Sequence, residues 1–267
     1  MHKNKIKKEI FLNRIIKINF NKKILDSEKE IKKIRKQISE GNLIIFKNFI
    51  KKNKVDQIKN YLITIAKNSL PNYEKISSET HNHHRVMRSD IRSFVQGAFH
   101  QFSFFPWNQD VFNFFDIFKD GFYLKNLISN NQINDYLSTK PKGATARVCF
   151  QFYPSGEGFL NCHSDPVGKH QITAPILIMS KKSLNGDFRK GGSYVLNKQK
   201  KKVFIENHAN IGDIVMYNAE IQHGVEIVDP QKKCGWLDFK GRWMMLFATN
   251  KLHNNKSIKN SKDFEKK

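Results

Sequence analysis

Hydrophobic residues in the N-terminal part of the chain recur at helical spacing in two places, with a short apolar run between them. Three isoleucines fall on one side of the segment from Ser27 to Gly41, where Ser27 and Glu30 form a capping box and Gly41 a stop. Asn42 to Ile50 predicts a strand, and the apolar residues between Val55 and Ile65 predict a second amphipathic helix. These elements indicate a scaffold in the order helix, strand, helix.

Two segments of different character follow this scaffold. Ser69 to Arg92 is polar and without periodicity, so it predicts a long loop, and loops of that length in compact domains are mostly lids or binding segments. Phe99 to Phe122 is dense in phenylalanine and predicts core packing against a sheet, with a helix from Asn108 to Phe118.

From Thr145 onward the pattern changes to short β-type runs separated by Gly, Asn and Asp, as in an antiparallel sandwich or barrel. Pro175 within the second run predicts an edge or a bulge. The expected strands are Thr145–Tyr153, Ile172–Met179, Ser193–Leu196, Lys202–Glu206, Ile214–Tyr217, Val225–Val228 and Arg242–Thr249.

The whole pattern predicts a mainly β protein with flanking helices, of the α+β class. Its core would be a double-stranded β-helix, that is, a cupin-like jelly roll with an N-terminal helical elaboration. We expect a single catalytic domain over residues 1–250, with a helical and loop scaffold and lid at 27–142 and the jelly-roll core at 143–250. The basic, lysine-rich tail at 251–267 predicts disorder.

Composition indicates the cellular compartment and the possible partners, but it says little about the reaction. The formal net charge is +23, but the lysines gather at the two ends, so a nucleic-acid partner is possible and not favoured over compositional bias. Three irregularly spaced cysteines suit neither a disulfide framework nor a zinc site and favour a reducing cytoplasm. No apolar run approaches membrane-spanning length and no secretory signal is present, so no membrane partner is expected. The sequence carries no signal for an oligomeric state.

The candidate chemistry begins at the triplet His163-Ser164-Asp165 and continues far downstream at His223. Residues two apart in a strand point the same way, so His163 and Asp165 can aim at one point. His223 follows a Gly212-Asp213 turn and a strand, which suits a third ligand from another strand of the same barrel. Two imidazoles and one carboxylate on one face of an octahedral metal are the ligand set of non-haem Fe(II) sites that activate oxygen.

One charged side chain in apolar surroundings adds to this site. Arg242 shares a strand face with Met244 and Leu246, and a buried arginine there needs a carboxylate partner, which a ligand could supply. Arg189 is the competing arginine, but it stands in a loop beside Lys190.

The strand that precedes the triplet is two-faced. Val148, Phe150 and Phe152 lie on its apolar side, whereas the other side is polar and ligand-like. The residues on the polar side are Arg147, Cys149, Gln151 and Tyr153.

The order of HxD, distal histidine and arginine before an apolar strand resembles the Fe(II)/2-oxoglutarate-dependent dioxygenases over roughly residues 145 to 250. Gly191-Gly192 and Gly212-Asp213 fall where such proteins commonly carry GG and GD turns. The resemblance implies that His163, Asp165 and His223 bind Fe(II), with 2-oxoglutarate as co-substrate and dioxygen as oxidant.

The same resemblance implies that Arg242 pairs with the far carboxylate of 2-oxoglutarate, whereas Gln151 and Tyr153 contact the co-substrate. A planar guanidinium suits bidentate pairing with a carboxylate. Two positions depart from the family pattern. Met244 stands where many members have a serine, and the spacing from His223 to Arg242 is longer than usual.

The resemblance implies hydroxylation of an unactivated C–H bond, because related halogenases lack the carboxylate that Asp165 provides; desaturation, epimerisation and ring formation are the alternatives. A small polar metabolite, such as an amino acid or a sugar derivative, is the leading substrate, with Arg147 and Arg85 as candidate contacts. One alternative is a nucleic-acid demethylase of the same superfamily, although Arg242 to Lys251 contains no second arginine. The other is a non-catalytic jelly-roll binding protein with a vestigial metal site.

Overall fold

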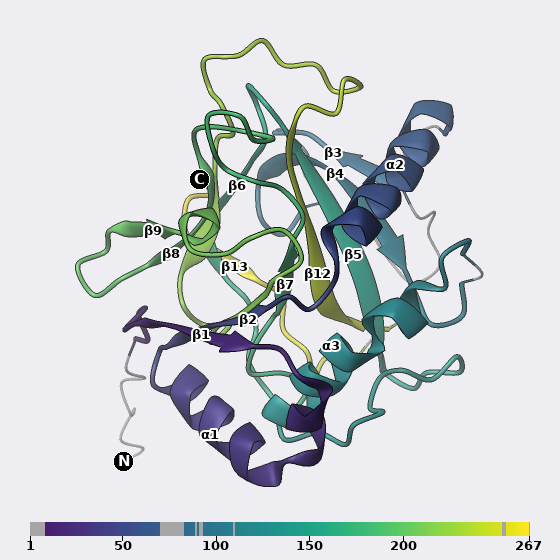
Figure 1. Ribbon diagram of the computed structural model, residues 1–267, viewed down its shortest axis with the longest axis vertical. Coiled ribbons are helices and arrows are strands. Elements are labelled where there is room, and N and C mark those ends of the chain that lie inside the picture. The colour runs from purple at the N-terminus through teal and green to yellow at the C-terminus, as the bar shows by residue number, and fades with distance from the viewer. Residues whose placement is uncertain are drawn as a thin grey trace.

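One curled sheet forms the centre of the molecule (Figure 1). The computed structural model describes residues 9–69, 83–88, 90, 93–108, 110–252 and 255–266. Its two longest strands, β5 (Ala144–Pro154) and β12 (Gly241–Lys251), pair antiparallel along their whole length. Strand order in the sheet is β1-β2-β10-β7-β12-β5-β4-β6-β11-β8-β9, with β3 on β4 and β13 on β6. The remaining strands are β1 Ile15–Asn19, β2 Leu43–Lys47, β3 His83–Val86, β4 Gly97–Phe104, β6 Phe159–Ser164, β7 Ile176–Ile178, β8 Gly192–Leu196, β9 Lys202–Phe204, β10 Ile214–Met216, β11 His223–Glu226 and β13 Lys262–Asp263.

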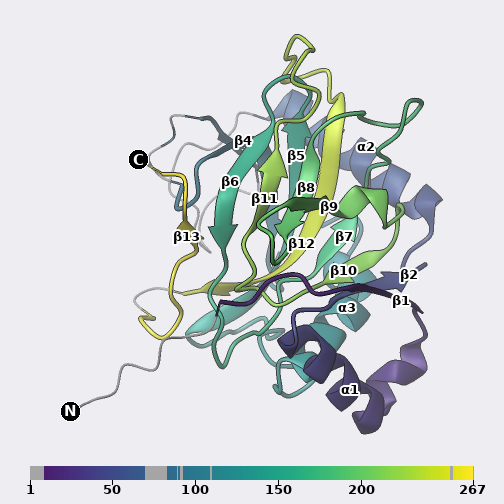
Figure 2. The ribbon, with the colours of Figure 1, turned by 90° about the vertical axis from the view of Figure 1, so that its left-hand side faces the viewer.

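Strand β4 turns the sheet over on itself. It pairs with β5 from His100 to Phe104 and with β6 through Gly97 and Ala98. The larger part of the sheet therefore continues into a smaller part made of β6, β11, β8 and β9, and Figure 2 shows β6, β11 and β8 running side by side. This arrangement is the jelly-roll architecture that the sequence predicts.

Alternation along the two long strands separates two hydrophobic cores. Phe150 of β5 and Phe247 of β12 belong to the core that packs the helices against the outer face of the larger sheet. Tyr153 and Met244 belong to the second core, which lies between the two parts of the sheet. The polar positions of β5 therefore face the interior of the jelly roll, as the two-faced pattern of this strand predicts.

The N-terminal scaffold forms as predicted. Helix α1 (Glu28–Ser39) begins after Ser27, whose hydroxyl accepts the Glu30 N–H at 3.4 Å, and it is followed by β2 and by α2 (Lys52–Asn68). A short 3₁₀ helix, η1 (Lys22–Asp26), precedes α1. Among the described residues, no helix is both long and apolar enough to cross a membrane.

The aromatic region differs from its prediction. The helix here is α3 (Phe114–Ile128), later and longer than Asn108–Phe118. The Asp110 carboxylate accepts the Phe112 and Phe114 N–H groups at 3.0 and 3.1 Å, which caps the helix start at this later point. Residues 99–104, expected only to pack on a sheet, belong to β4 itself.

The predicted loop from Ser69 to Arg92 contains strand β3, which pairs with β4. Residues 70–82, 89, 91 and 92 of that loop lie outside the described residues. The strand pairing comes from long-range contacts, which a local sequence pattern does not carry.

Two other predicted strands are shorter in the structure. The strand expected at Lys202–Glu206 ends at Phe204 and continues as the 3₁₀ helix η2 (Ile205–Asn207). The strand expected at Ile172–Met179 begins only at Ile176, directly after Pro175, which lacks the N–H needed for a sheet ladder.

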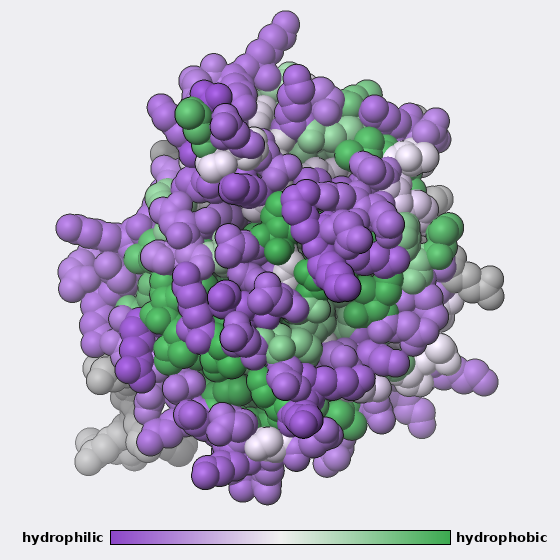
Figure 3. Space-filling model, in the orientation of Figure 1, coloured by the Kyte–Doolittle hydropathy of each residue, from purple (hydrophilic) through white to green (hydrophobic). Residues whose placement is uncertain are grey.

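The C-terminal segment, residues 255–266, is ordered where the sequence predicts a disordered tail. Its strand β13 pairs Lys262 with Ser164 and Asp263 with His163. The Asp263 carboxylate accepts the Gln96 N–H at 2.9 Å, which fixes the segment at the edge of the smaller sheet. Hydrophilic residues cover most of the molecular face shown in Figure 3, in keeping with the lysine-rich composition.

Candidate functional site

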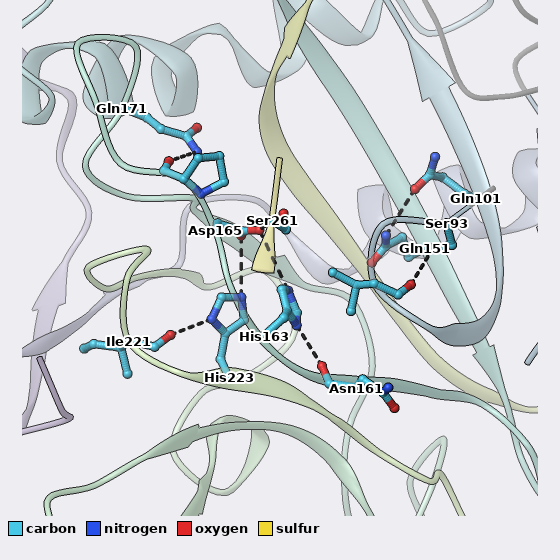
Figure 4. A network of polar contacts seen from close by, with 12 residues as sticks. Ser93, Gln101, Gln151, Asn161, His163, Asp165, Gln171, Ile221, His223 and Ser261 are labelled. Atoms are coloured by element: carbon cyan, nitrogen blue, oxygen red, sulfur yellow. Dashed lines mark hydrogen bonds and ion pairs between the residues drawn. The ribbon is translucent and has the colours of Figure 1, made fainter. Parts of the chain in front are cut away.

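His163, Asp165 and His223 converge on one point in the interior of the jelly roll (Figure 4). His163 lies near the end of β6, Asp165 just beyond it, and His223 begins β11 directly opposite His163 in the strand register. His163 Nε2 lies 3.8 Å from Asp165 Oδ1, and His223 Nε2 lies 3.5 Å from Asp165 Oδ2. One ligand atom from each residue falls within 4.8 Å of the others, so the three side chains can hold a metal ion.

Backbone carbonyls orient both imidazoles toward that point. His163 Nδ1 donates to the Asn161 carbonyl at 2.8 Å, and His223 Nδ1 donates to the Ile221 carbonyl at 2.7 Å. Because a carbonyl oxygen only accepts, Nδ1 carries a proton in each ring, and Nε2 is the nitrogen turned toward the shared point. This is the arrangement that fixes a metal-binding histidine.

Electrostatics place His163 and Asp165 in the protonation states that a divalent cation requires. Burial lowers the pKa of His163 to about 4, and nearby His223 acts in the same direction. Burial alone raises the pKa of Asp165, but its hydrogen bond with His223 and the proximity of His163 outweigh burial and hold the pKa well below its ordinary value. A neutral His163 imidazole and an ionised Asp165 carboxylate therefore face one point.

The C-terminal segment completes the setting of Asp165. The Ser261 hydroxyl donates to Asp165 Oδ1 at 2.6 Å, and the Asp165 N–H donates to the Ala219 carbonyl at 2.9 Å. Ser261 could not be predicted from the sequence, because a polar tail without periodicity gives no signal of a contact 96 residues away.

A cavity of about 770 Å³ adjoins the three candidate ligands. Gln151, Tyr153 and Arg147 of β5 line it, as does Met244 of β12. The Tyr153 hydroxyl donates to Gln151 Oε1 at 2.6 Å, and the Gln151 amide donates to Gln101 Oε1 at 3.2 Å. The polar side of β5 thus supplies a connected row of hydrogen-bonding groups along one wall.

Arg242 is 1% exposed and lies beside this wall, with its guanidinium carbon 5.3 Å from the centre of the Tyr153 ring. Its Nε donates to Oε1 of Glu206, a buried carboxylate that also accepts from the Ser193 hydroxyl at 2.7 Å. Both Nη atoms are buried with no hydrogen-bond partner among the described residues. A protein carboxylate therefore neutralises the arginine and leaves its two Nη atoms free for a second acceptor, although Arg242 itself is not among the residues that line the cavity.

Glu206 was not anticipated from sequence. It ends the apolar run Val203-Phe204-Ile205, and a carboxylate next to such a run is the one local sign of an acid turned into the core.

The other sequence candidates lie apart from the three ligands. Arg85 is not among the cavity-lining residues, and its guanidinium stacks over Trp236 at 4.3 Å. Arg189 is exposed, and its Nε donates to the Leu184 carbonyl at 3.0 Å.

No protein-family model matches this chain, and no curated protein matches its sequence. Solved structures do match. The chain is similar to a prolyl-4-hydroxylase of Pseudomonas putida, with a TM-score of 0.51 at 11% identity over 84% of this chain and 100% of that one. It is also similar to a putative oxygenase of Shewanella oneidensis, with a TM-score of 0.53 at 13% identity over 91% of each chain. An oxidoreductase of the 2OG-Fe(II) oxygenase family from Burkholderia pseudomallei matches at 0.48 and 11% identity, over 90% of this chain and 98% of that one.

At these identities the comparison concerns the fold. The chain has the jelly-roll fold of known oxygenases, which is the fold expected from its resemblance to the dioxygenases.

Proposed function

We propose that this chain is an Fe(II)- and 2-oxoglutarate-dependent oxygenase that hydroxylates a C–H bond of a small polar metabolite. The single observation that carries the proposal is the convergence of His163, Asp165 and His223, with each imidazole held by a backbone carbonyl, inside an oxygenase-type fold. A non-catalytic binding protein with a vestigial metal site would not need two imidazoles oriented in this way.

The donor set fits a ferrous ion. Two neutral nitrogen ligands and one carboxylate supply three positions of an octahedron and leave three for co-substrate and oxygen. Bound iron would supply the oxygen activation, and the protein's part is to hold the ligands and to keep the reaction in a restricted cavity.

Arg242 fits the far carboxylate of 2-oxoglutarate. Its two unpartnered Nη atoms match the two oxygens of a carboxylate, and burial strengthens such a charge-assisted pair. Glu206 holds the guanidinium in place through Nε, so the fork is oriented before the co-substrate arrives. Tyr153 and Gln151 line the cavity beside it and can position the rest of the molecule.

The cavity suits a small substrate. A volume of about 770 Å³ lies within the range of small-molecule pockets, and part of that space would be taken by the co-substrate. Apolar side chains such as Ile176, Leu246 and Ile258 alternate with polar ones along its lining.

The test is succinate release from 2-oxoglutarate in the presence of Fe(II), screened against amino acids and sugar derivatives. Wild type should release succinate in step with product, and His163→Ala should release none. His208→Ala is the matched control, because His208 lies outside the cavity lining, and it should retain full activity. Equal succinate release by His163→Ala, or none by wild type with any substrate, would remove the proposal.

A further inference from the structure

The charged residues that line the cavity are unevenly balanced. Arg147, Lys251 and Lys259 are cationic, and among the described lining residues Asp165 is the acidic one. Asp165 belongs to the candidate metal ligands and would be neutralised by the ion. The wall away from the metal ligands therefore carries positive charge without a matching acid, which favours an anionic ligand.

Lys125 strengthens this imbalance from behind the wall. It lies on α3, is 1% exposed, and its ammonium donates to the hydroxyl of Thr249 on β12. No described carboxylate lies within ion-pair distance of its nitrogen. Burial lowers the pKa of Lys125 to about 7, while the charge of Asp165 favours its charged form. A buried lysine without a counter-ion destabilises a fold unless something else makes it useful.

Arg147 lies at the same end of the cavity. It pairs with Ala248 in the β5–β12 register, next to the Thr249 that contacts Lys125. The Arg147 Nε is buried with no hydrogen-bond partner in the described part of the chain. The charge of Arg147 also lowers the pKa of Lys125, so the two cations are close enough to repel each other.

Two further polar atoms at this end lack partners. His170 Nε2 and Gln171 Oε1 are buried without a hydrogen bond to any described residue. Gln171 lines the cavity, and the charge of Lys125 lowers the pKa of His170 after the larger effect of burial. Lys125, Arg147, His170 and Gln171 together form what we call the cationic recess. Such a group of unsatisfied buried atoms is expected where a polar ligand completes the site.

The cationic recess is distinct from the place proposed for 2-oxoglutarate. Arg242 and Ala248 stand six residues apart on β12, which is about 20 Å at ~3.3 Å per residue. Glu206 and the Tyr153 ring hold the Arg242 guanidinium at one end of this span. Thr249 holds the Lys125 ammonium at the other end, so a five-carbon dicarboxylate is too short to reach both charges. An anion at the recess must therefore belong to another molecule.

The geometry points to a substrate-binding function for the cationic recess: Arg147, which lines the cavity, binds a carboxylate or phosphate group of the substrate, and the charge of Lys125 behind the wall strengthens the attraction, while the aliphatic part of the substrate lies along the apolar wall toward the metal ligands. The identification of the bound anion as the substrate rests on the proposed oxygenase function. Anion binding by the recess does not depend on that function. Ile176, Leu246 and Ala248 supply the apolar wall. This narrows the substrate to a small acidic molecule with an aliphatic C–H bond.

Anion binding can be measured on the full chain without iron or 2-oxoglutarate. Calorimetric titrations with propionate and with inorganic phosphate at low ionic strength separate the two anion chemistries. Wild type should bind one of them saturably, and Arg147→Gln should weaken that binding about tenfold or more. Arg189→Gln removes an exposed arginine outside the cavity and should bind like wild type.

Lys125→Met distinguishes a lysine that attracts the anion from a lysine that only stabilises the fold. Methionine fills similar space without a buried charge, so the variant should bind the anion more weakly yet melt a few degrees higher than wild type. A lower Tm with unchanged anion binding would mean that the Lys125–Thr249 contact is structural and would overturn the assignment. Should Lys125→Met not fold, Arg147→Gln, at a half-buried position, decides the question.

Three results would overturn the anion site itself. They are equal affinity in wild type, Arg147→Gln and Arg189→Gln; no binding of either probe to wild type; and binding lost in Arg242→Gln but kept in Arg147→Gln. In the oxygenase assay, Arg147→Gln should raise KM for the substrate and leave KM for 2-oxoglutarate unchanged. Anion binding that depends on Arg147 in a protein that never releases succinate would defeat the proposed function and leave the anion site standing.

Discussion

Ser261 donates a 2.6 Å hydrogen bond to Oδ1 of Asp165, and so the last residues of the chain touch a candidate metal ligand directly. Asp263, two residues after the serine, also lies against the candidate ligands. Asp263 pairs with His163 in β13 and β6, and its carboxylate accepts from the Asn161 side chain, whose own backbone carbonyl orients His163. The C-terminal segment therefore contributes to the position of two of the three ligands.

Removing the Ser261 hydroxyl should weaken metal binding without unfolding the protein. Hydrogen bonds to metal ligands typically change metal affinity by about 10- to 100-fold, and we expect Ser261→Ala to lie near the lower end because Asp165 also keeps its backbone hydrogen bond to Ala219. Titration with Mn(II), followed by electron paramagnetic resonance, measures the dissociation constant. Ser257→Ala is the matched control, since the Ser257 hydroxyl contacts Asn255 at a distance from the site. Identical affinities for both variants would show that Ser261 does not position Asp165.

Removing the charge of Arg242 and removing that of Glu206 should change the affinity for 2-oxoglutarate in opposite directions. Arg242→Met leaves the Glu206 carboxylate buried without its cation, so the free energy of unfolding should fall by about 3–5 kcal/mol and KM for 2-oxoglutarate should rise. Glu206→Gln removes the negative charge that competes with the co-substrate, so 2-oxoglutarate should bind more tightly although the fold is less stable. Urea unfolding and co-substrate titration test both variants. Weaker 2-oxoglutarate binding in Glu206→Gln would contradict the role given to the open Nη atoms.

Acidification should destabilise the metal-free protein between about pH 6.5 and pH 4. Burial lowers the pKa of both His83 and His100 from 6.5 to about 4, and their rings are joined by a 2.9 Å hydrogen bond from one Nε2 to the other Nδ1. Over that interval the unfolded chain takes up protons that the folded chain does not, so stability is fully present above the ordinary pKa and decreases as pH falls. Urea unfolding at several pH values should show this slope, and His83→Gln/His100→Gln should reduce it to the part that His163 and His170 contribute, since burial also lowers their pKa to about 4. A stability that rises on acidification would be incompatible with the buried neutral pair.

The sequence is informative where residues repeat at short range. The HxD spacing, the GD turn before the strand that leads to His223 and the two faces of β5 are local patterns, so the candidate ligands and the Gln151–Tyr153 wall could be predicted. Glu206, Lys125 and Ser261 could not. Each acts through a partner 36 to 124 residues away, and nothing next to them in the sequence signals that partner. The strand β13 was missed for the same reason, because its pairing with β6 depends on an edge that only the folded sheet provides.

The most direct test of the central claim is the visible spectrum of the protein after anaerobic addition of Fe(II) and 2-oxoglutarate. If His163, Asp165 and His223 hold one ferrous ion while Arg242 secures the co-substrate, a weak metal-to-ligand charge-transfer band should appear and saturate at one iron per chain. The band should be absent in His223→Ala. A wild-type protein that binds no iron, or a band that persists unchanged in His223→Ala, would contradict the account.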